Sequence, residues 1–396
     1  MASGPTTLQP QPSAASVPHK PASLCPRLAG RLVKSKSKSG HAVRLDHPAH
    51  PSAEEIDRLF TVTSATDSAA FKLSSSASYV DICKSMYKSK TVVVDCGSAL
   101  VGKDKPVAQV TLAESATKGE FALIFSVSHS VADGRTYYDV FKMLQPGGAV
   151  RALASTRVQS FSEAMRDKCG RREIEWADSA AAGVLFVGGA LKSALGCGGG
   201  KAQCHAFSLD AERVAKAKAA GAAEGGVEYV TTNDVLTSAF LSVCGSRIGW
   251  MGFDCRGKVE GVGPDLAGNY VTALVLGPEV FGTPADLRRM YAEVPYVTTK
   301  RPLPGPCECS STFAQVSNWA SFAGELVQLE GCELVIHLPA LNPAYATMGG
   351  ADQMVPFSYG VGKKGVLCWV VNTNEAALRE ALPVGGTVSE KLFPPV

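Results

Sequence analysis

The sequence lacks an apolar run long enough to cross a membrane, because a spanning helix needs about eighteen or more predominantly apolar residues in a row. Its most apolar stretch, AAAGVLFVGGALKSALG at residues 180–196, is interrupted by glycines and by Lys192. We therefore expect a protein without a transmembrane segment. The 396 residues, 45% of them hydrophobic, suffice for one large globular domain or two ordinary ones.

Basic charge is also scarce outside the start of the chain. The formal net charge is +3, but residues 1–45 contain seven Lys and Arg and no acid, so the remainder has 32 basic and 36 acidic residues. That remainder lacks the basic excess typical of a nucleic-acid-binding domain. We expect no nucleic-acid partner.

The twelve cysteines form no recognisable framework. They are scattered through a long chain with no secretory signal, which indicates reduced thiols rather than disulfides. Cys307 and Cys309 are closely spaced, yet neither a second pair nor a nearby histidine completes a zinc site. The sequence predicts no metal.

Residues 1–40 are rich in Ser, Pro and basic residues without apolar periodicity, which predicts a disordered basic leader. Its lack of acids is also typical of a transit peptide, although its prolines disfavour an amphipathic helix. We expect a cytoplasmic protein, with a plastid or a mitochondrion as the alternative. Order should begin near residues 52–60, where Ser52 and Glu55 match a capping box.

Alternating strand and helix patterns predict an α/β fold in two lobes, at residues 41–195 and 196–396. In the first lobe a helix with one apolar face should follow Gly134. In the second, Thr232 should cap a helix that follows the helix at 210–221. The expected strands are 90–97, 106–112, 120–128, 204–209, 269–276, 313–319, 332–338 and 365–371.

Histidine, the usual general base near neutral pH, occurs only three times after residue 50. His337 lies in the apolar segment ELVIHLPA and is expected in the core. His205 begins a strand and has no acidic or nucleophilic neighbour in sequence. His129 ends a strand, Asp133 follows four residues later, and Gly134 should permit a tight exit into a helix. From these residues alone, a histidine in an ordinary turn remains the alternative.

The segment SVSHSVADG, residues 126–134, resembles the HxxxDG motif of the chloramphenicol acetyltransferase-like superfamily, which includes BAHD acyltransferases and the condensation domains of peptide synthetases. Further segments resemble the family in the same order over about residues 100–320: PVAQVTL, FSLDAERVAKAKAAG, YVTTNDVLTSAFL, FDCRGKV followed by AGNYV, and VSNW. The segments FSLDAERVAKAKAAG and YVTTNDVLTSAFL favour the BAHD group over the condensation domains. So does the single Ser128, where condensation domains usually carry a second histidine.

This resemblance implies two chloramphenicol acetyltransferase-like lobes, each a mixed β-sheet with flanking helices, that form a central tunnel around His129. Acyl-CoA would enter as co-substrate from one side and a small-molecule alcohol or amine from the other. No bound cofactor is implied, and we expect a monomer. His129 would act as the general base that accepts the proton of the attacking acceptor.

The resemblance also assigns roles to other residues of the site. It implies that Asp133 pairs with Arg256, although Asp133 orienting the imidazole directly, as in a catalytic triad, is the alternative. Ser317, and after it Asn318, would donate to the oxyanion, with a packed strand-end serine as the alternative. Structural support of the site is expected from Gly134, Arg256, Asn269 and Trp319.

The chain departs from the family at one motif. BAHD enzymes carry a DFGWG-like segment after the later strand, and the nearest candidate here, QLEGCEL at residues 328–334, has neither the Phe nor the Trp. A non-catalytic relative that binds a partner is therefore one alternative function. A condensation-type enzyme that uses a carrier-bound acyl group is another.

Overall fold

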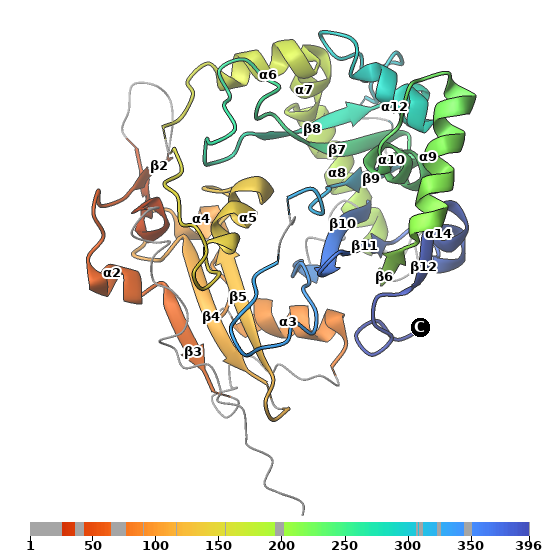
Figure 1. Ribbon diagram of the computed structural model, residues 1–396. Helices are drawn as coiled ribbons and strands as arrows, with labels where there is room; N and C mark the ends of the chain where they lie inside the picture. The colour runs from red at the N-terminus through yellow and green to blue at the C-terminus, as the bar shows by residue number, and fades with distance from the viewer. Residues whose placement is uncertain are drawn as a thin grey trace, which may run out of the picture.

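The structure is a computed structural model that describes residues 26–35, 43–64, 77–89, 91–115, 117–154, 156–194, 202–305, 308, 312–322, 326–343 and 351–395. It is a mixed α/β fold, as the sequence predicts, built around two mixed β-sheets (Figure 1). None of the helices formed by these residues combines the length and the apolarity that a membrane crossing needs.

The smaller of the two mixed sheets has three strands in the order β3–β4–β5. Strand β3 (Phe60–Thr63) pairs parallel to β4 (Ala108–Glu114), and β4 pairs antiparallel to β5 (Phe121–Val127). Helix α5 (Gly134–Lys142) follows β5, and its Tyr138, Val140 and Phe141 join Phe125 in one buried cluster. The strand, polar turn and helix predicted around His129 are therefore confirmed.

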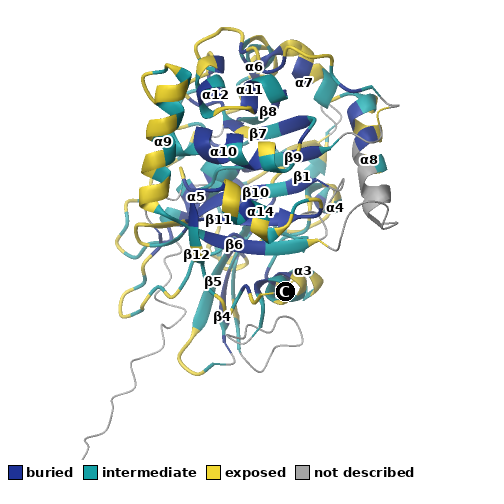
Figure 2. Cartoon of the chain, turned by 90° about the vertical axis from the view of Figure 1, so that its right-hand side faces the viewer, coloured by how far each residue is buried: buried dark blue, intermediate teal, exposed yellow. Residues whose placement is uncertain are grey.

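The larger sheet has seven strands in the order β12–β6–β11–β10–β9–β7–β8, and its only parallel pairings are those of β9 with β10 and β7 among the described strands. The bounds are β6 Gln203–Leu209, β7 Ile248–Asp254, β8 Val271–Leu276, β9 Phe313–Val316, β10 Asp352–Gly360, β11 Lys363–Val370 and β12 Val384–Thr387. Figure 2 shows strands β7, β10 and β11 mostly buried and helix α9 mostly exposed at one edge.

The remaining elements flank these sheets. They are η2 Pro26–Ala29, β1 Arg31–Lys34, β2 Val43–Asp46, α2 Ala53–Asp57, α3 Tyr79–Ser89, α4 Gly97–Leu100, α6 Phe161–Cys169, α7 Arg171–Ala177, α8 Ala180–Ala194, α9 Ala211–Gly225, α10 Thr232–Val243, α11 Pro278–Phe281, α12 Pro284–Met290 and α14 Glu375–Ala381. The expected capping box of Ser52 and Glu55 is present at α2. Helix α10 is capped by Thr231 and not by Thr232, because the Thr231 hydroxyl accepts from the N–H of Asp234.

Each mixed sheet is packed partly by residues from the other half of the chain. The buried cluster of the seven-stranded sheet includes residues that precede residue 195, namely Phe161 and Cys169 of α6 and Ile174 of α7. Conversely, Leu326 and Val327 pack into the cluster on the three-stranded sheet. The lobe boundaries drawn from the sequence stay predictions.

Residues 26–34 correct the prediction of disorder up to residue 40. Strand β1 pairs antiparallel to β2, and Leu32 is buried with Val131 and Ala132 of the loop that carries His129. These few apolar side chains order the segment because the loop and the strands supply contacts that the segment's own composition does not reveal. The other parts of the predicted leader, residues 1–25 and 36–40, lie outside the described residues.

Two expected strands are absent from the sheets described here. In residues 90–97 the N–H of Val94 donates to the Ser126 hydroxyl rather than to a neighbouring strand, and α4 begins at Gly97. A Cβ at Gly97 would lie 1.8 Å from the Ser130 hydroxyl oxygen, so a larger residue there would require this side chain to move. Residues 332–338 run beside β10 with a backbone hydrogen bond from His337 to Tyr359, without forming a ladder.

Candidate active site

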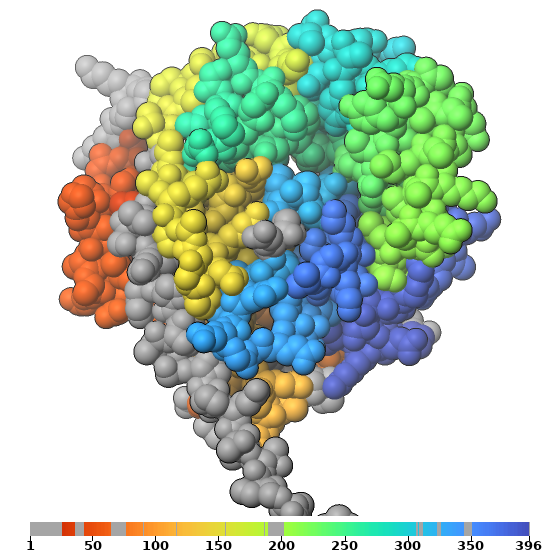
Figure 3. All heavy atoms as spheres, viewed as in Figure 1, coloured from red at the N-terminus to blue at the C-terminus, as the bar shows by residue number. Residues whose placement is uncertain are grey.

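A cavity of about 2270 Å³ lies against both mixed sheets, and its lining includes His129, Gly134, Ser317, Asn318, Trp319 and His337. Figure 3 shows a small opening near the middle of one face of the molecule, between green and blue segments. Residues 126–134 and 316–319, far apart in sequence, thus contribute to the same cavity.

His129 stands two residues beyond the end of β5 and its side chain is exposed. Asn269 makes two contacts with His129. Its amide nitrogen donates to the backbone carbonyl of His129, and its amide oxygen lies 3.2 Å from the imidazole Nδ1. A carbonyl only accepts, so the first contact fixes which end of the amide faces the ring. In the neutral imidazole, Nδ1 then carries the proton and Nε2 the lone pair.

Asp133 is the N-cap of α5, where its carboxylate accepts from the backbone N–H of Thr136 at 2.9 Å. The same carboxylate accepts from the N–H of Tyr270 at 2.9 Å and from both terminal nitrogens of Arg256, at 2.8 and 3.2 Å. Burial raises the pKa of Asp133, but the hydrogen bonds from Arg256 and the two N–H groups outweigh it and leave the pKa below its usual value. The structure therefore brings Asp133 and Arg256 together, as predicted.

Arg256 connects this carboxylate to residues 266–270. Its Nε donates to the Leu266 carbonyl at 2.7 Å, and its Nη2 donates to the Gly268 carbonyl at 3.0 Å. Gly268 has a φ of +127°, a backbone conformation that favours glycine. Since Asn269 is the next residue, the buried pair fixes the loop that holds the imidazole. None of the hydrogen bonds of Asp133 among the described residues involves the His129 ring.

Gly134 corrects one expectation. It begins α5 without a positive φ, and a Cβ there would lie 3.5 Å from the Phe322 ring and 4.0 Å from the Trp319 indole nitrogen. These are ordinary contacts, so the predicted steric need for glycine is wrong. The same distances show that the motif loop packs against the segment after β9.

Ser317 and Asn318 sit at the end of β9. The Ser317 hydroxyl oxygen accepts from the Trp319 indole N–H at 2.9 Å, which leaves the hydroxyl proton free for another acceptor. The Asn318 amide nitrogen instead donates to the Asn233 side-chain oxygen at 2.9 Å. Ser317 can thus donate its hydroxyl proton, whereas one of the two amide protons of Asn318 is already engaged.

The two other histidines differ in their surroundings. His205 lies within β6, and its Nδ1 is 3.4 Å from a Glu375 carboxylate oxygen, an acidic neighbour that the local sequence did not reveal. His337 is partly buried, but it lines the cavity, which sequence reasoning missed. Its ring lies 5.8 Å from those of Tyr138 and Phe141. No signal within ELVIHLPA could have revealed these distant partners.

The segment QLEGCEL packs beside the same cavity. Leu329 and Leu334 lie against the cluster on the three-stranded sheet, and Cys332 and Glu333 line the cavity. In the part of the chain that the structure describes, no three His, Cys, Asp or Glu side chains are arranged to hold a metal ion. Cys307 and Cys309 lie outside the described residues.

No protein-family model matches the chain, and a search of curated proteins finds no match either. Among solved structures, F. sporotrichioides TRI101 complexed with coenzyme A and T-2 is 15% identical, with a TM-score of 0.47 over 91% of this chain and 86% of that chain. The first condensation domain of the calcium-dependent antibiotic synthetase, in complex with a substrate analogue, is 13% identical, with a TM-score of 0.49 over 89% and 80%. VibH, an NRPS condensation enzyme, is 13% identical, with a TM-score of 0.46 over 91% and 82%.

Proposed function

We propose that the chain is an acyltransferase that moves an acyl group from acyl-CoA to a hydroxyl or amine acceptor, with His129 as the general base. The observation that carries this proposal is the double contact of Asn269 with His129. In the neutral ring this contact selects the tautomer with its lone pair on Nε2, which is the form that a general base needs. The HxxxDG resemblance supplies the reaction class.

In the proposed reaction, Nε2 of His129 accepts the proton of the acceptor hydroxyl or amine while its oxygen or nitrogen attacks the thioester carbon. A new C–O or C–N bond forms, and the tetrahedral intermediate carries its negative charge on the former carbonyl oxygen. The C–S bond then breaks, and the imidazolium returns its proton to the departing thiolate. No covalent acyl-enzyme is required.

Ser317 is proposed as the donor to the tetrahedral oxygen. Its oxygen accepts from Trp319, its proton makes no hydrogen bond to the described residues, and it lines the same cavity as His129. A donor placed in this way contributes roughly 3 kcal/mol to the transition state. Asp133 and Arg256 act as positioning residues, because they fix the loop that bears Asn269 and do not contact the imidazole.

The route of the substrates belongs to the same proposal. Acyl-CoA and the acceptor enter the cavity from opposite sides, along a tunnel between lobes formed by residues 41–195 and 196–396. The reaction takes place without a bound cofactor. Holding both substrates against one base converts a bimolecular step into an effectively unimolecular one, an advantage of roughly 7 kcal/mol.

The test compares thiol release from acyl-CoAs in the presence of a panel of alcohols and amines, for wild type and His129→Ala. Loss of a general base should lower the rate about 100- to 10,000-fold. The melting temperature should hardly change, because the side chain is exposed. His205→Ala, in a strand of the other sheet, is the matched control and should stay active.

Equal rates for wild type and His129→Ala would disprove the proposed mechanism. Transfer from a phosphopantetheine thioester on a carrier protein, with none from acyl-CoA, would instead favour the condensation-type reaction. Each result is read from the same thiol assay.

A further inference from the structure

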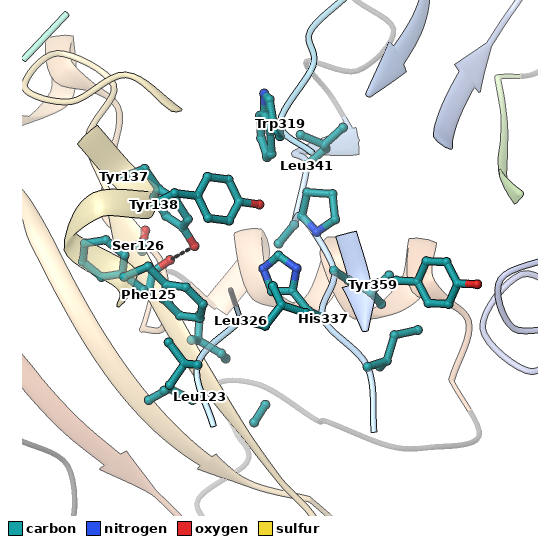
Figure 4. Close-up of a pocket in the computed structure, with 18 of the residues that line it drawn as sticks. Leu123, Phe125, Ser126, Tyr137, Tyr138, Trp319, Leu326, His337, Leu341 and Tyr359 are labelled. Carbon is teal, nitrogen blue, oxygen red and sulfur yellow. Dashed lines mark hydrogen bonds between the residues drawn. The ribbon is translucent and has the colours of Figure 1, made fainter. Parts of the chain in front are cut away.

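One end of the cavity is an apolar pocket walled by rings (Figure 4). Phe125, Tyr137 and Tyr138 lie on one side of the view, and His337 and Tyr359 lie on the other. The ring centroids of Phe125 and Tyr137 are 5.0 Å apart, and Leu123, Leu326 and Leu341 line the same cavity. Such walls favour a flat or ring-bearing apolar ligand.

His337 presents an acceptor to this pocket. Its Nδ1 lies 2.7 Å from the Ser358 backbone oxygen, and since that oxygen only accepts, Nδ1 carries the proton. Burial lowers the pKa of His337 more than this hydrogen bond raises it, so the ring is neutral near pH 7. Nε2 therefore keeps a lone pair, and no hydrogen bond to it is made by the described residues.

Tyr138 presents a donor to the same pocket. Its side chain is only 1% exposed, and its hydroxyl makes no hydrogen bond within the described part of the chain. Figure 4 shows the ring directed away from β5, toward the space between Trp319 and His337. The neighbouring Tyr137 differs, because its hydroxyl donates to the Phe125 carbonyl at 3.1 Å. A hydroxyl that faces a cavity and has no protein partner is available to donate to a ligand there.

The two free groups are neighbours. The rings of Tyr138 and His337 meet edge to face with centroids 5.8 Å apart. One hydroxyl of a ligand can donate to Nε2 of His337 and accept from the Tyr138 hydroxyl at the same time. An ether or a methyl group at that place could not make both bonds.

This pocket is separate from the base. Phe125, on its wall, precedes His129 by four residues, and His129 lies two residues beyond the end of β5, so the two side chains line different parts of the same cavity. A ligand that reaches both would need two polar groups separated by a rigid apolar body.

We propose that Tyr138 and His337 form a subsite for a second, non-reacting hydroxyl of the acceptor, and that the acceptor is a ring-bearing apolar molecule with polar groups at opposite ends. The inference rests on the proposed function, because that function makes the molecule beside His129 an acceptor. The ligand's remote hydroxyl sets its depth in the cavity and thereby brings its reacting group to Nε2 of His129.

The test measures binding of 4,4′-dihydroxybiphenyl by calorimetry, without acyl-CoA, to wild type, Tyr138→Phe and Tyr296→Phe. Tyr138→Phe removes a hydroxyl that has no partner among the described residues, so the fold should be unaffected. The dissociation constant should rise about 3- to 10-fold in Tyr138→Phe, the effect of one lost hydrogen bond. Tyr296→Phe, which removes the hydroxyl of a buried ring that does not line the cavity, is the matched control and should bind as wild type does.

Two further arms separate this inference from the proposed function. His129→Ala should keep the difference between wild type and Tyr138→Phe even if it abolishes transfer. Binding that Tyr138→Phe leaves within twofold of wild type would overturn the subsite, as would absence of binding to the wild type. An effect of Tyr138→Phe on acyl-CoA affinity alone would also overturn it, since the pocket would then hold the acyl group.

Discussion

Arg256 and Asp133, separated by 123 residues, form a buried ion pair with two hydrogen bonds, at 2.8 and 3.2 Å. Their side chains are 3% and 2% exposed. The guanidinium also contacts Leu266 and Gly268, so one pair fastens the start of α5 to the loop that bears Asn269. Removing either partner should therefore affect both the fold and the base.

Arg256→Ala should destabilise the protein by about 3 kcal/mol or more, because it leaves a buried carboxylate without its countercharge. Melting temperature and turnover should fall together. Arg58→Ala is the control, since Arg58 pairs with Glu54 at a site where both side chains are mostly exposed, at 55% and 77%. Exposed pairs contribute about 0 to 1 kcal/mol. An Arg256→Ala protein with wild-type melting temperature and turnover would contradict the role given to this pair.

Acid should weaken the same pair. The pKa of Asp133 is below its usual value in the folded protein because the hydrogen bonds outweigh the effect of burial. A carboxylate with a lowered folded pKa contributes stability above its unfolded pKa of about 3.9, and this contribution is lost as the pH falls through the folded pKa. Melting temperatures measured from about pH 6 downward should fall more steeply for wild type than for Asp133→Asn. Parallel curves would show that Asp133 has no such linkage.

Asn269→Ala should lower kcat about 10-fold, the effect of losing one hydrogen bond that holds the imidazole in its tautomer. The KM for acyl-CoA should be unchanged, since Asn269 is not proposed to bind the thioester. Asn269→Asp keeps an oxygen that can accept from Nδ1 and should recover part of the rate. A raised KM with unchanged kcat would instead show that Asn269 acts on binding.

The strand and helix around His129 could be predicted because their signals are local. The run EFALIFSVS and the apolar face after Gly134 each lie within a few residues, and β5 and α5 form there. Strand β10 went unnoticed because most of its residues are buried, so its sequence does not alternate, and Pro356 argues against a strand. The cap of α10 was misplaced by one position because two adjacent threonines offer the same hydroxyl.

The site itself could be predicted only where a known motif links distant residues. Asp133 and Arg256 were paired through two such motifs, and the structure contains the pair. No such motif links Nε2 of His337 with the hydroxyl of Tyr138. Their meeting depends on how residues 326–343 fold back onto α5, which no local pattern encodes.

The contact between Asn269 and His129 also determines when the base is completed during synthesis. His129 leaves the ribosome 140 residues before Asn269, the residue that contacts its Nδ1. Arg256, which holds the loop of Asn269, is also synthesised long after His129. Chains are made from the N-terminus at about 5 to 20 residues per second, so the imidazole spends several seconds outside the ribosome without its partner. If His129 is the base, as proposed, a nascent chain that contains the whole segment 126–134 still lacks the contact that orients the imidazole until translation has passed residue 269.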